Sequence, residues 1–198
     1  RYIDQIPASG ITEEDRSMIK GEALFLRGYQ YFLLVNNYKE VPLRLIPSNE
    51  DETNKGPASE AALWTQVEED LGNAIKCNLP VERTTAKERV TKGAAIAMLG
   101  KVYATQHKYP EAKQLLVSLL SAPYSYELVD DFAKNFTNEE EFNKESVYEI
   151  AYSPDGEYSW SNESGICLGC YIPQFIGPVK SGGWAKLCLL YTSPSPRD

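Results

Sequence analysis

The sequence is poor in the residues that build metal and redox sites. Its 198 residues include one histidine, His107, and four cysteines. These cysteines, Cys77, Cys167, Cys170 and Cys188, are too few and too unevenly spaced to define a disulfide framework. Cys167 and Cys170 have the C-x2-C spacing, but a zinc site needs a second pair of ligands, and His107 lies far upstream. We therefore expect neither a metal site nor a cofactor.

An excess of positive charge and a long apolar run are also missing. Twenty basic residues face 28 acidic ones, which gives a net charge of −8. This charge would repel a phosphate backbone, so we expect no nucleic-acid partner. No stretch of about 20 apolar residues could span a bilayer, and the first residues do not form a secretion signal. We therefore expect either a cytoplasmic protein or one whose export signal is missing.

The chain is instead rich in amphipathic rings, with 13 tyrosines and 3 tryptophans. Its hydrophobic share of 42% and charged share of 24% are ordinary for a globular protein. A chain of this length buries roughly 70% of its unfolded surface, so it needs no disulfide for stability.

A long helix is predicted to begin at Thr12, where a hydroxyl followed three residues later by an acid forms a capping motif. The helix should stop at Val41, because Pro42 disfavours a helical conformation at the residue before it. Its apolar residues fall on two adjoining stripes: Ile19, Ala23, Leu26 and Leu33 on one, and Phe25, Phe32 and Val35 on the other. This wide arc predicts a helix buried on more than one side.

Three further helices follow a polar loop at residues 44–58. Ser59 caps the first of them, which should end at Leu79 before a proline. The next begins at either Thr85 or Thr91, and both starts stay open. The last runs from Pro110 to about Leu120, with proline in its first turn. An all-α fold results.

The last two of these helices match the tetratricopeptide pattern. Leu99, Gly100, Tyr103 and Ala112 match directly, and Leu116 replaces phenylalanine conservatively. Ile96 stands for the usual tryptophan, and Pro123 lies one residue from the expected proline. The pattern predicts helical hairpins stacked in a right-handed superhelix, with Tyr103 and Leu116 filling the seam between neighbouring hairpins.

Beyond Pro123 the helical periodicity ends. Residues 146–152 alternate as a short strand or extended segment would, and residues 153–187 are rich in loop-forming residues and aromatics. The final residues, 188–198, differ in character and are expected to be a non-native tail. We therefore predict a helical scaffold at residues 1–152, a loop-rich region with little strand, and this tail, in a chain truncated at both ends.

The stretch GEALFLRGYQYFLLVNNYKEVPL, residues 21–43, resembles the signature helix of the SusD/RagB family. Three further segments resemble family motifs in the same order: residues 64–75, residues 89–112, and SVYEIAYS from Ser146. Gly182, Gly183 and Trp184 resemble the start of a later motif. The resemblance covers about residues 12–187.

This resemblance implies a SusD-like fold and a nutrient-binding role. Family members are surface-exposed outer-membrane lipoproteins of glycan-degrading bacteria, and they carry no catalytic activity. They form a lid on a SusC-like TonB-dependent transporter and capture oligosaccharides for it. By resemblance, we expect non-catalytic glycan binding at the outer-membrane surface, with membrane association only through a lipid anchor that this fragment lacks.

The loop-rich region supplies the expected ligand residues. Rings there could stack on sugar faces while nearby polar groups bond the hydroxyls. The candidates are Trp160, Tyr158, Tyr171 and Trp184, within a wider group that includes Tyr152 and Phe175. Trp160 is preferred because small polar residues flank it. The alternative is that these rings pack against sequence that the fragment lacks.

Two other functions were weighed. A helical-repeat scaffold could dock a protein partner without binding sugar. Catalysis is not expected, because the adjacent acids at Glu68 and Glu69 and at residues 139–141 cannot face each other as a glycosidase pair must. His107 has no identifiable nucleophile partner. The signature helix is expected to be scaffold, with Glu22 and Arg27 each bonding to other parts of the chain rather than to each other.

Overall fold

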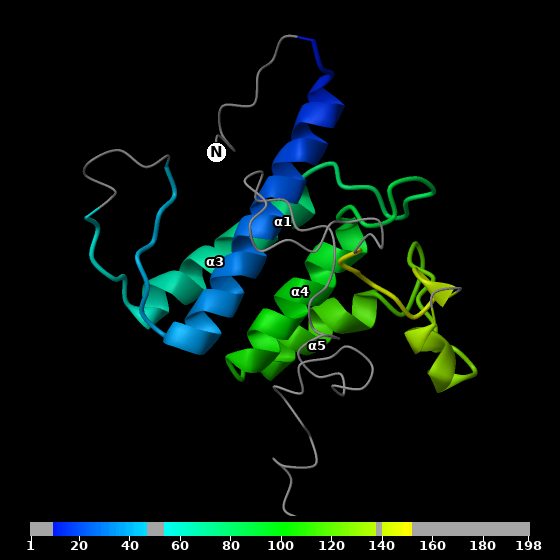
Figure 1. Ribbon diagram of the computed structural model, residues 1–198. Helices are drawn as coiled ribbons and strands as arrows, with labels where there is room; N and C mark the ends of the chain where they lie inside the picture. The colour runs from blue at the N-terminus through cyan, green and yellow to red at the C-terminus, as the bar shows by residue number, and fades with distance from the viewer. Residues whose placement is uncertain (1–9, 47–53, 138–139, 152–198) are drawn as a thin grey trace, which may run out of the picture. The chain divides into compact units, whose positions relative to one another are not determined.

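The computed structural model describes residues 10–46, 54–137 and 140–151. They form four α-helices and a short 3-10 helix, and no β-strand occurs among them (Figure 1). The elements are α1 (Glu13–Tyr38), α3 (Glu60–Lys76), α4 (Lys92–Thr105), α5 (Tyr109–Ser118) and η2 (Phe132–Phe136). By its contacts the chain divides into residues 1–149 and 150–198. In the part that is described, no helix is long and apolar enough to cross a membrane.

Side-chain caps begin three of the helices. The hydroxyls of Thr12, Ser59 and Thr91 each accept a hydrogen bond from a backbone N–H three residues further on, at 3.1 to 3.3 Å. These caps confirm the predicted starts, because each satisfies an N–H group that the helix itself leaves unpaired. Of the two starts left open for the third predicted helix, Thr91 is right and Thr85 is wrong. Thr85 lies in the loop before α4.

The first two helices end earlier than predicted. α1 ends at Tyr38, where Lys39 adopts a φ of 64° and its N–H bonds to the carbonyl oxygen of Val35 at 3.0 Å. α3 ends at Lys76, and the following Cys77 is extended. The prolines that suggested the later ends lie a few residues beyond each helix, so they mark the loop rather than the last turn.

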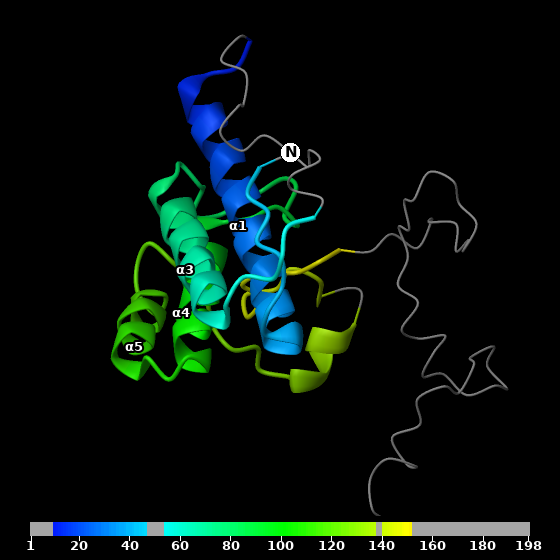
Figure 2. The same ribbon diagram turned by 90° about the vertical axis from the view of Figure 1, so that its left-hand side faces the viewer.

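The helices form two hairpins that pack in chain order. α1 packs against α3, α3 against α4, and α4 against α5, while α1 and α4 touch only slightly (Figures 1 and 2). This arrangement confirms the predicted all-α, tetratricopeptide-like fold. At the junction between the hairpins, Glu68 of α3 accepts a hydrogen bond from Gln106 at 2.7 Å and pairs with Lys108.

Two glycines of the signature helix allow α3 to lie close to α1. A Cβ atom at Gly21 would lie 2.8 Å from the Cβ of Cys77, and one at Gly28 would lie 3.0 Å from the Cγ of Leu71. Around this contact lies the core, and its most deeply buried residues include Phe25, Val35, Leu63, Val67, Leu71 and Val102. Glycine therefore sets the spacing of the first hairpin.

One prediction about α1 is wrong. Phe25, Phe32 and Val35 are buried, but the adjoining stripe is not: Ile19 is 37% exposed, Leu26 45% and Leu33 38%, and Ala23 is half-buried. Among the described helices only α3 packs extensively on α1, so a single face is covered. A wide apolar arc shows that this side of the helix favours burial, but it does not show which residues pack against it.

The tetratricopeptide positions of the second hairpin are confirmed with one change. Leu99 and Ala112 are buried, and a Cβ atom at Gly100 would lie 2.6 Å from a methyl carbon of Leu116. Leu116 therefore fills the space over Gly100 within its own hairpin. Its predicted place was the seam between hairpins, and 39% of its surface is exposed.

Charged residues fasten the signature helix to two other parts of the chain. Arg27 donates two hydrogen bonds to Asp70 of α3, from Nε at 2.7 Å and from Nη2 at 2.6 Å. Glu22 pairs with Arg83 and Arg89 of the loop before α4. The prediction that Glu22 and Arg27 bond elsewhere is therefore confirmed.

Candidate ligand-binding cleft

The aromatic residues predicted to bind ligand lie outside the described residues. This holds for Trp160, Tyr158, Tyr171 and Trp184, which stay predictions. A candidate site on the helical scaffold therefore has to be sought among residues 10–151, in the parts that the structure describes.

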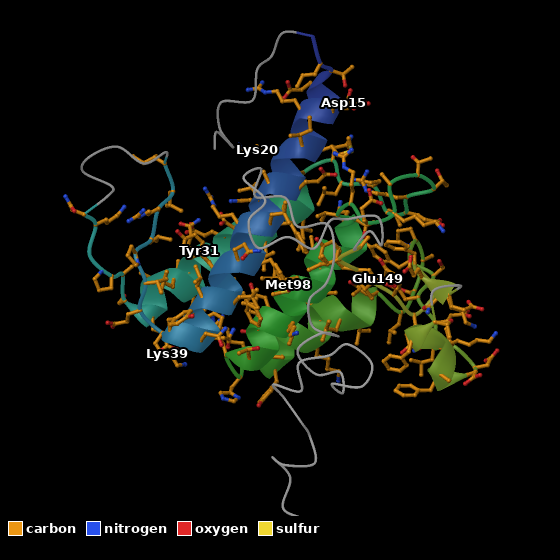
Figure 3. The ribbon with its side chains drawn as sticks, viewed as in Figure 1. Asp15, Lys20, Tyr31, Lys39, Met98 and Glu149 are labelled. Carbon is orange, nitrogen blue, oxygen red and sulfur yellow. The ribbon has the colours of Figure 1, made fainter. Side chains whose placement is uncertain are left out.

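A cleft of about 300 Å³ lies where three irregular segments meet. They are residues 81–91 between α3 and α4, residues 123–126 after α5, and residues 142–149. We call it the tyrosine cleft, because Tyr124, Tyr126 and Tyr148 line it. Figure 3 labels Glu149, which also lines the cleft and lies on the side of the scaffold where these segments gather.

The first wall of the cleft is tied to the scaffold through Arg83. Its guanidinium donates two hydrogen bonds to the carbonyl oxygen of Val90, at 2.9 and 3.1 Å, and pairs with Glu22 of α1. Glu22 also accepts a hydrogen bond from Arg89 at 2.6 Å. A loop without regular structure is in this way held in one arrangement by largely buried charge-assisted bonds.

The second wall is braced by carboxylates that bind backbone N–H groups. Glu149 accepts from the N–H of Phe142 at 3.1 Å, and Glu145 accepts from the N–H of Val129 at 3.1 Å. The backbone bond from Val129, with a further bond from Asn135, lowers the pKa of Glu145. The N–H of Glu127 also bonds to the carbonyl oxygen of Lys144 at 3.0 Å, which joins the segments on either side of η2.

Tyr124 and Tyr126 stack on each other. Their rings are nearly parallel, at 11°, with centroids 6.1 Å apart. The two residues are two positions apart, a spacing that places both side chains on one side wherever the chain is extended. The hydroxyl end of Tyr126 lies against Gly93 in the first turn of α4, where an added Cβ atom would overlap it. Glycine at position 93 therefore positions the second ring.

Tyr148 brings a third ring from the core to the cleft. Its ring meets that of Phe25 edge to face, with centroids 5.1 Å apart. Burial raises the pKa of Tyr148, as do the nearby Tyr29 and Glu22. Burial likewise raises the pKa of Tyr124, and Tyr126 adds to the effect. Both phenols consequently stay neutral and able to donate at physiological pH.

None of the three tyrosine hydroxyls, those of Tyr124, Tyr126 and Tyr148, is held by a hydrogen bond within the described part of the chain. Among the residues that the structure describes, no buried side-chain nitrogen or oxygen lacks a partner, so these hydroxyls are not completely buried, although that of Tyr126 lies against Gly93. The cleft therefore combines aromatic surface with hydroxyls that a polar ligand could reach.

Most charged side chains at the cleft pair with other groups of the protein. Arg83, Lys144 and Glu149 have partners within the protein. Glu82 and Lys87 line the cleft, are exposed, and pair with no other described residue. Nothing in the described ranges gathers three or more residues able to hold a metal ion. The arrangement suits stacking and hydrogen bonding.

This cleft was not predicted from the sequence, because the aromatic residues that suggested a ligand site lie in the loop-rich region. The available signal was the alternation Tyr124-Ser125-Tyr126, which predicts two rings on one side of an extended segment. Nothing in the sequence indicated that residues 81–91 would form the opposite wall.

Comparison with known proteins gives a consistent result. Residues 2–104 match a family model described as starch-binding and associating with the outer membrane. A laminarin-binding SusD-like protein of known structure is 33% identical, with a TM-score of 0.75 over 81% of this chain and 36% of its own. A SusD superfamily protein from Bacteroides vulgatus is 35% identical, with a TM-score of 0.64 over 71% of this chain and 30% of its own.

A more distant structure shares the fold. Surface glycan-binding protein A from Bacteroides thetaiotaomicron, solved with laminarihexaose, is 22% identical, with a TM-score of 0.75 over 89% of this chain and 37% of its own. This chain thus spans about a third of the length of these structures. A search of curated proteins found no match. The family model, which covers more than half of the sequence, and the solved relatives together show that this chain belongs to the SusD-like family.

Proposed function

We propose that the protein binds oligosaccharides at the outer-membrane surface and passes them, unchanged, to a SusC-like TonB-dependent transporter. The observation that carries this proposal is the 33% identity, over 81% of the chain, to a laminarin-binding protein of the same family. The family description, starch-binding and associating with the outer membrane, supports the ligand class and the location. A lipid anchor would hold the protein at the surface.

Binding without catalysis is consistent with the acids that the structure describes. Glu68, one member of the predicted surface pairs, is held by Gln106 and Lys108 at the junction between the hairpins. Glu149 of the cleft is occupied by a backbone N–H. A glycosidase needs two carboxyl groups facing each other about 5 to 9 Å apart across a sugar, with one of them able to protonate the leaving oxygen. These acids serve the scaffold instead.

Affinity electrophoresis in gels containing laminarin or starch tests the proposal. We expect either glycan to retard the protein, while an unrelated protein of similar charge migrates unchanged. Isothermal titration with laminarihexaose then gives the dissociation constant, and chromatography of the same mixture should show no shorter products. Absence of retardation and of binding heat with every neutral glycan tested would overturn the proposal.

Partnership with a transporter needs a separate assay. An affinity-tagged full-length protein, expressed with its native signal and extracted from outer membranes in mild detergent, should retain a large TonB-dependent transporter. The Trp160→Ala variant should keep that contact and lose sugar retention, because Trp160 is predicted to face the ligand. A variant that loses both would place Trp160 in the scaffold.

The exposed stripe of α1 favours a second candidate function, that of a protein-interaction module. Ile19, Leu26 and Leu33 are spaced by seven residues, so they form one apolar line along the helix. If this candidate is right, Leu26→Asp should abolish retention of the transporter and leave retardation by glycan unchanged. If Leu26→Asp instead retains the transporter and loses retardation by glycan, the protein-interaction function is excluded.

A further inference from the structure

We infer that the tyrosine cleft is a carbohydrate subsite that takes a neutral pyranose segment. The inference rests on the proposed function, because it assigns residues of the helical scaffold to the same class of ligand. Its basis is the gathering in one cleft of three tyrosine rings, two of them stacked on each other, whose hydroxyls have no hydrogen-bond partner in the described part of the chain.

The ring pair provides the stacking surface. A pyranose presents a face of C–H groups, and this face packs on the electron-rich face of a tyrosine or tryptophan. Tyr124 and Tyr126 are stacked within 11° of parallel, so each supports the other and a sugar would pack on an outer face of the pair.

The hydroxyls and the volume define what fits. The hydroxyls of Tyr124, Tyr126 and Tyr148 can each donate and accept, which matches the alternating hydroxyls of a sugar edge. A volume of about 300 Å³ is at the lower end of the range of roughly 300 to 1,000 Å³ found for ligand sites. The cleft therefore suits a short segment or one end of a glycan rather than a long stretch.

The charge balance selects a neutral ligand. Arg83 and Lys144 pair with carboxylates of the protein, so the basic group left for a ligand is Lys87, and the exposed Glu82 opposes it. A uronic acid or sulfated sugar usually needs guanidinium or ammonium groups directed at its anion. With one basic and one acidic group at the cleft, such a ligand gains no net attraction.

The walls are preorganised, which lowers the cost of binding. The bonds of Arg83 fix the first wall, those of Glu149 and Glu145 fix the second, and the contact with Gly93 fixes the Tyr126 ring. Side chains that are already ordered lose little freedom when a ligand arrives. The site is therefore formed by the fold before any sugar is present.

Titration of the full-length protein with laminarihexaose tests the assignment, with maltohexaose as a second neutral probe. Tyr124→Ala removes one stacking surface and should raise the dissociation constant of the cleft by up to about tenfold. Gly93→Ala keeps all three tyrosines but displaces the Tyr126 ring, and it should weaken binding in the same direction. Phe136→Ala is the matched control, because this ring is 75% exposed and does not line the cleft.

The outcomes separate the inference from the proposed function. If the wild type binds neither probe, the proposed function fails and the inference with it. If the wild type binds and Tyr124→Ala and Gly93→Ala both retain its affinity and stoichiometry, the function stands and the cleft assignment is overturned. Should Tyr124→Ala not fold by circular dichroism, Tyr124→Phe and Tyr126→Phe replace it, and unchanged affinity in both overturns the assignment. Tighter binding of a glucuronic-acid oligosaccharide than of laminarihexaose would refute the neutral assignment.

Discussion

Removal of the Asp70 carboxylate should be one of the most damaging single changes to the scaffold. Asp70 is only 1% exposed, and it receives two hydrogen bonds from Arg27 and one from Gln66 at 2.9 Å. Asp70→Ala would leave the guanidinium of Arg27 largely buried without this partner. Breaking one side of a buried ion pair costs about 3 to 5 kcal/mol of unfolding free energy.

The loss of unfolding free energy for Asp70→Ala should lie near the lower end of this range. The Arg27 side chain keeps 21% of its surface exposed, so its charge can turn partly toward water. We therefore expect a loss of about 3 kcal/mol. For a folded unit of this size each kcal/mol lowers the melting temperature by about 2 to 4 °C, which gives a decrease of about 10 °C.

Urea denaturation followed by circular dichroism at 222 nm measures this loss. The matched control is Glu13→Ala, which breaks an exposed pair with Arg16 and should cost at most about 1 kcal/mol. Arg27→Met and the double variant complete a double-mutant cycle. Because the double variant removes both members of the pair, its loss of unfolding free energy should be smaller than the sum of the two single losses by about 2 kcal/mol or more. A loss below 1 kcal/mol for Asp70→Ala, or strict additivity, would refute the argument.

Three further predictions use the same denaturation assay. Gly72→Ala should raise the unfolding free energy by up to about 1 kcal/mol, since a Cβ atom there meets nothing within 4 Å and alanine favours helix. Gly21→Ala should lower it despite the same propensity gain, because its Cβ atom would lie 2.8 Å from that of Cys77; a stabilised variant would contradict the close packing of α1 on α3. The pKa of Glu145 is lowered because its ionised carboxylate accepts the bond from Val129. This bond therefore stabilises the fold at pH values above the ordinary pKa of glutamate, about 4, and the stabilisation is lost as the pH falls below the lowered pKa. Wild type and Glu145→Gln should therefore differ at neutral pH and converge in acid, and a difference that persists at pH 2 would exclude this role.

Local chemistry made most of the scaffold predictable. The hydroxyls of Thr12, Ser59 and Thr91 begin helices because each satisfies an N–H group within one turn, and such a signal is complete within four residues. Gly100 and Ala112 indicated a tight hairpin for a similar reason, since small residues at fixed spacing admit a neighbouring helix.

The pairing of distant residues was not predictable. Nothing around Arg27 indicates Asp70 as its partner, 43 positions away, and nothing around Tyr124 indicates residues 81–91 as the facing wall. Such contacts depend on how helices are stacked, which no local pattern encodes. The same limit explains why Leu26 was wrongly predicted to be buried. An apolar side chain favours burial, but only the three-dimensional arrangement decides whether another part of the chain packs on it.

The order in which the helices touch has a consequence for how the scaffold comes apart. Among the described helices α5 contacts α4 alone, while α3 contacts both α1 and α4. Opening of α5 therefore removes one interface, whereas opening of α3 removes two and exposes the buried charge of Asp70. Loss of structure should thus proceed inward from α5, and amide hydrogens there should exchange with solvent long before those of α3.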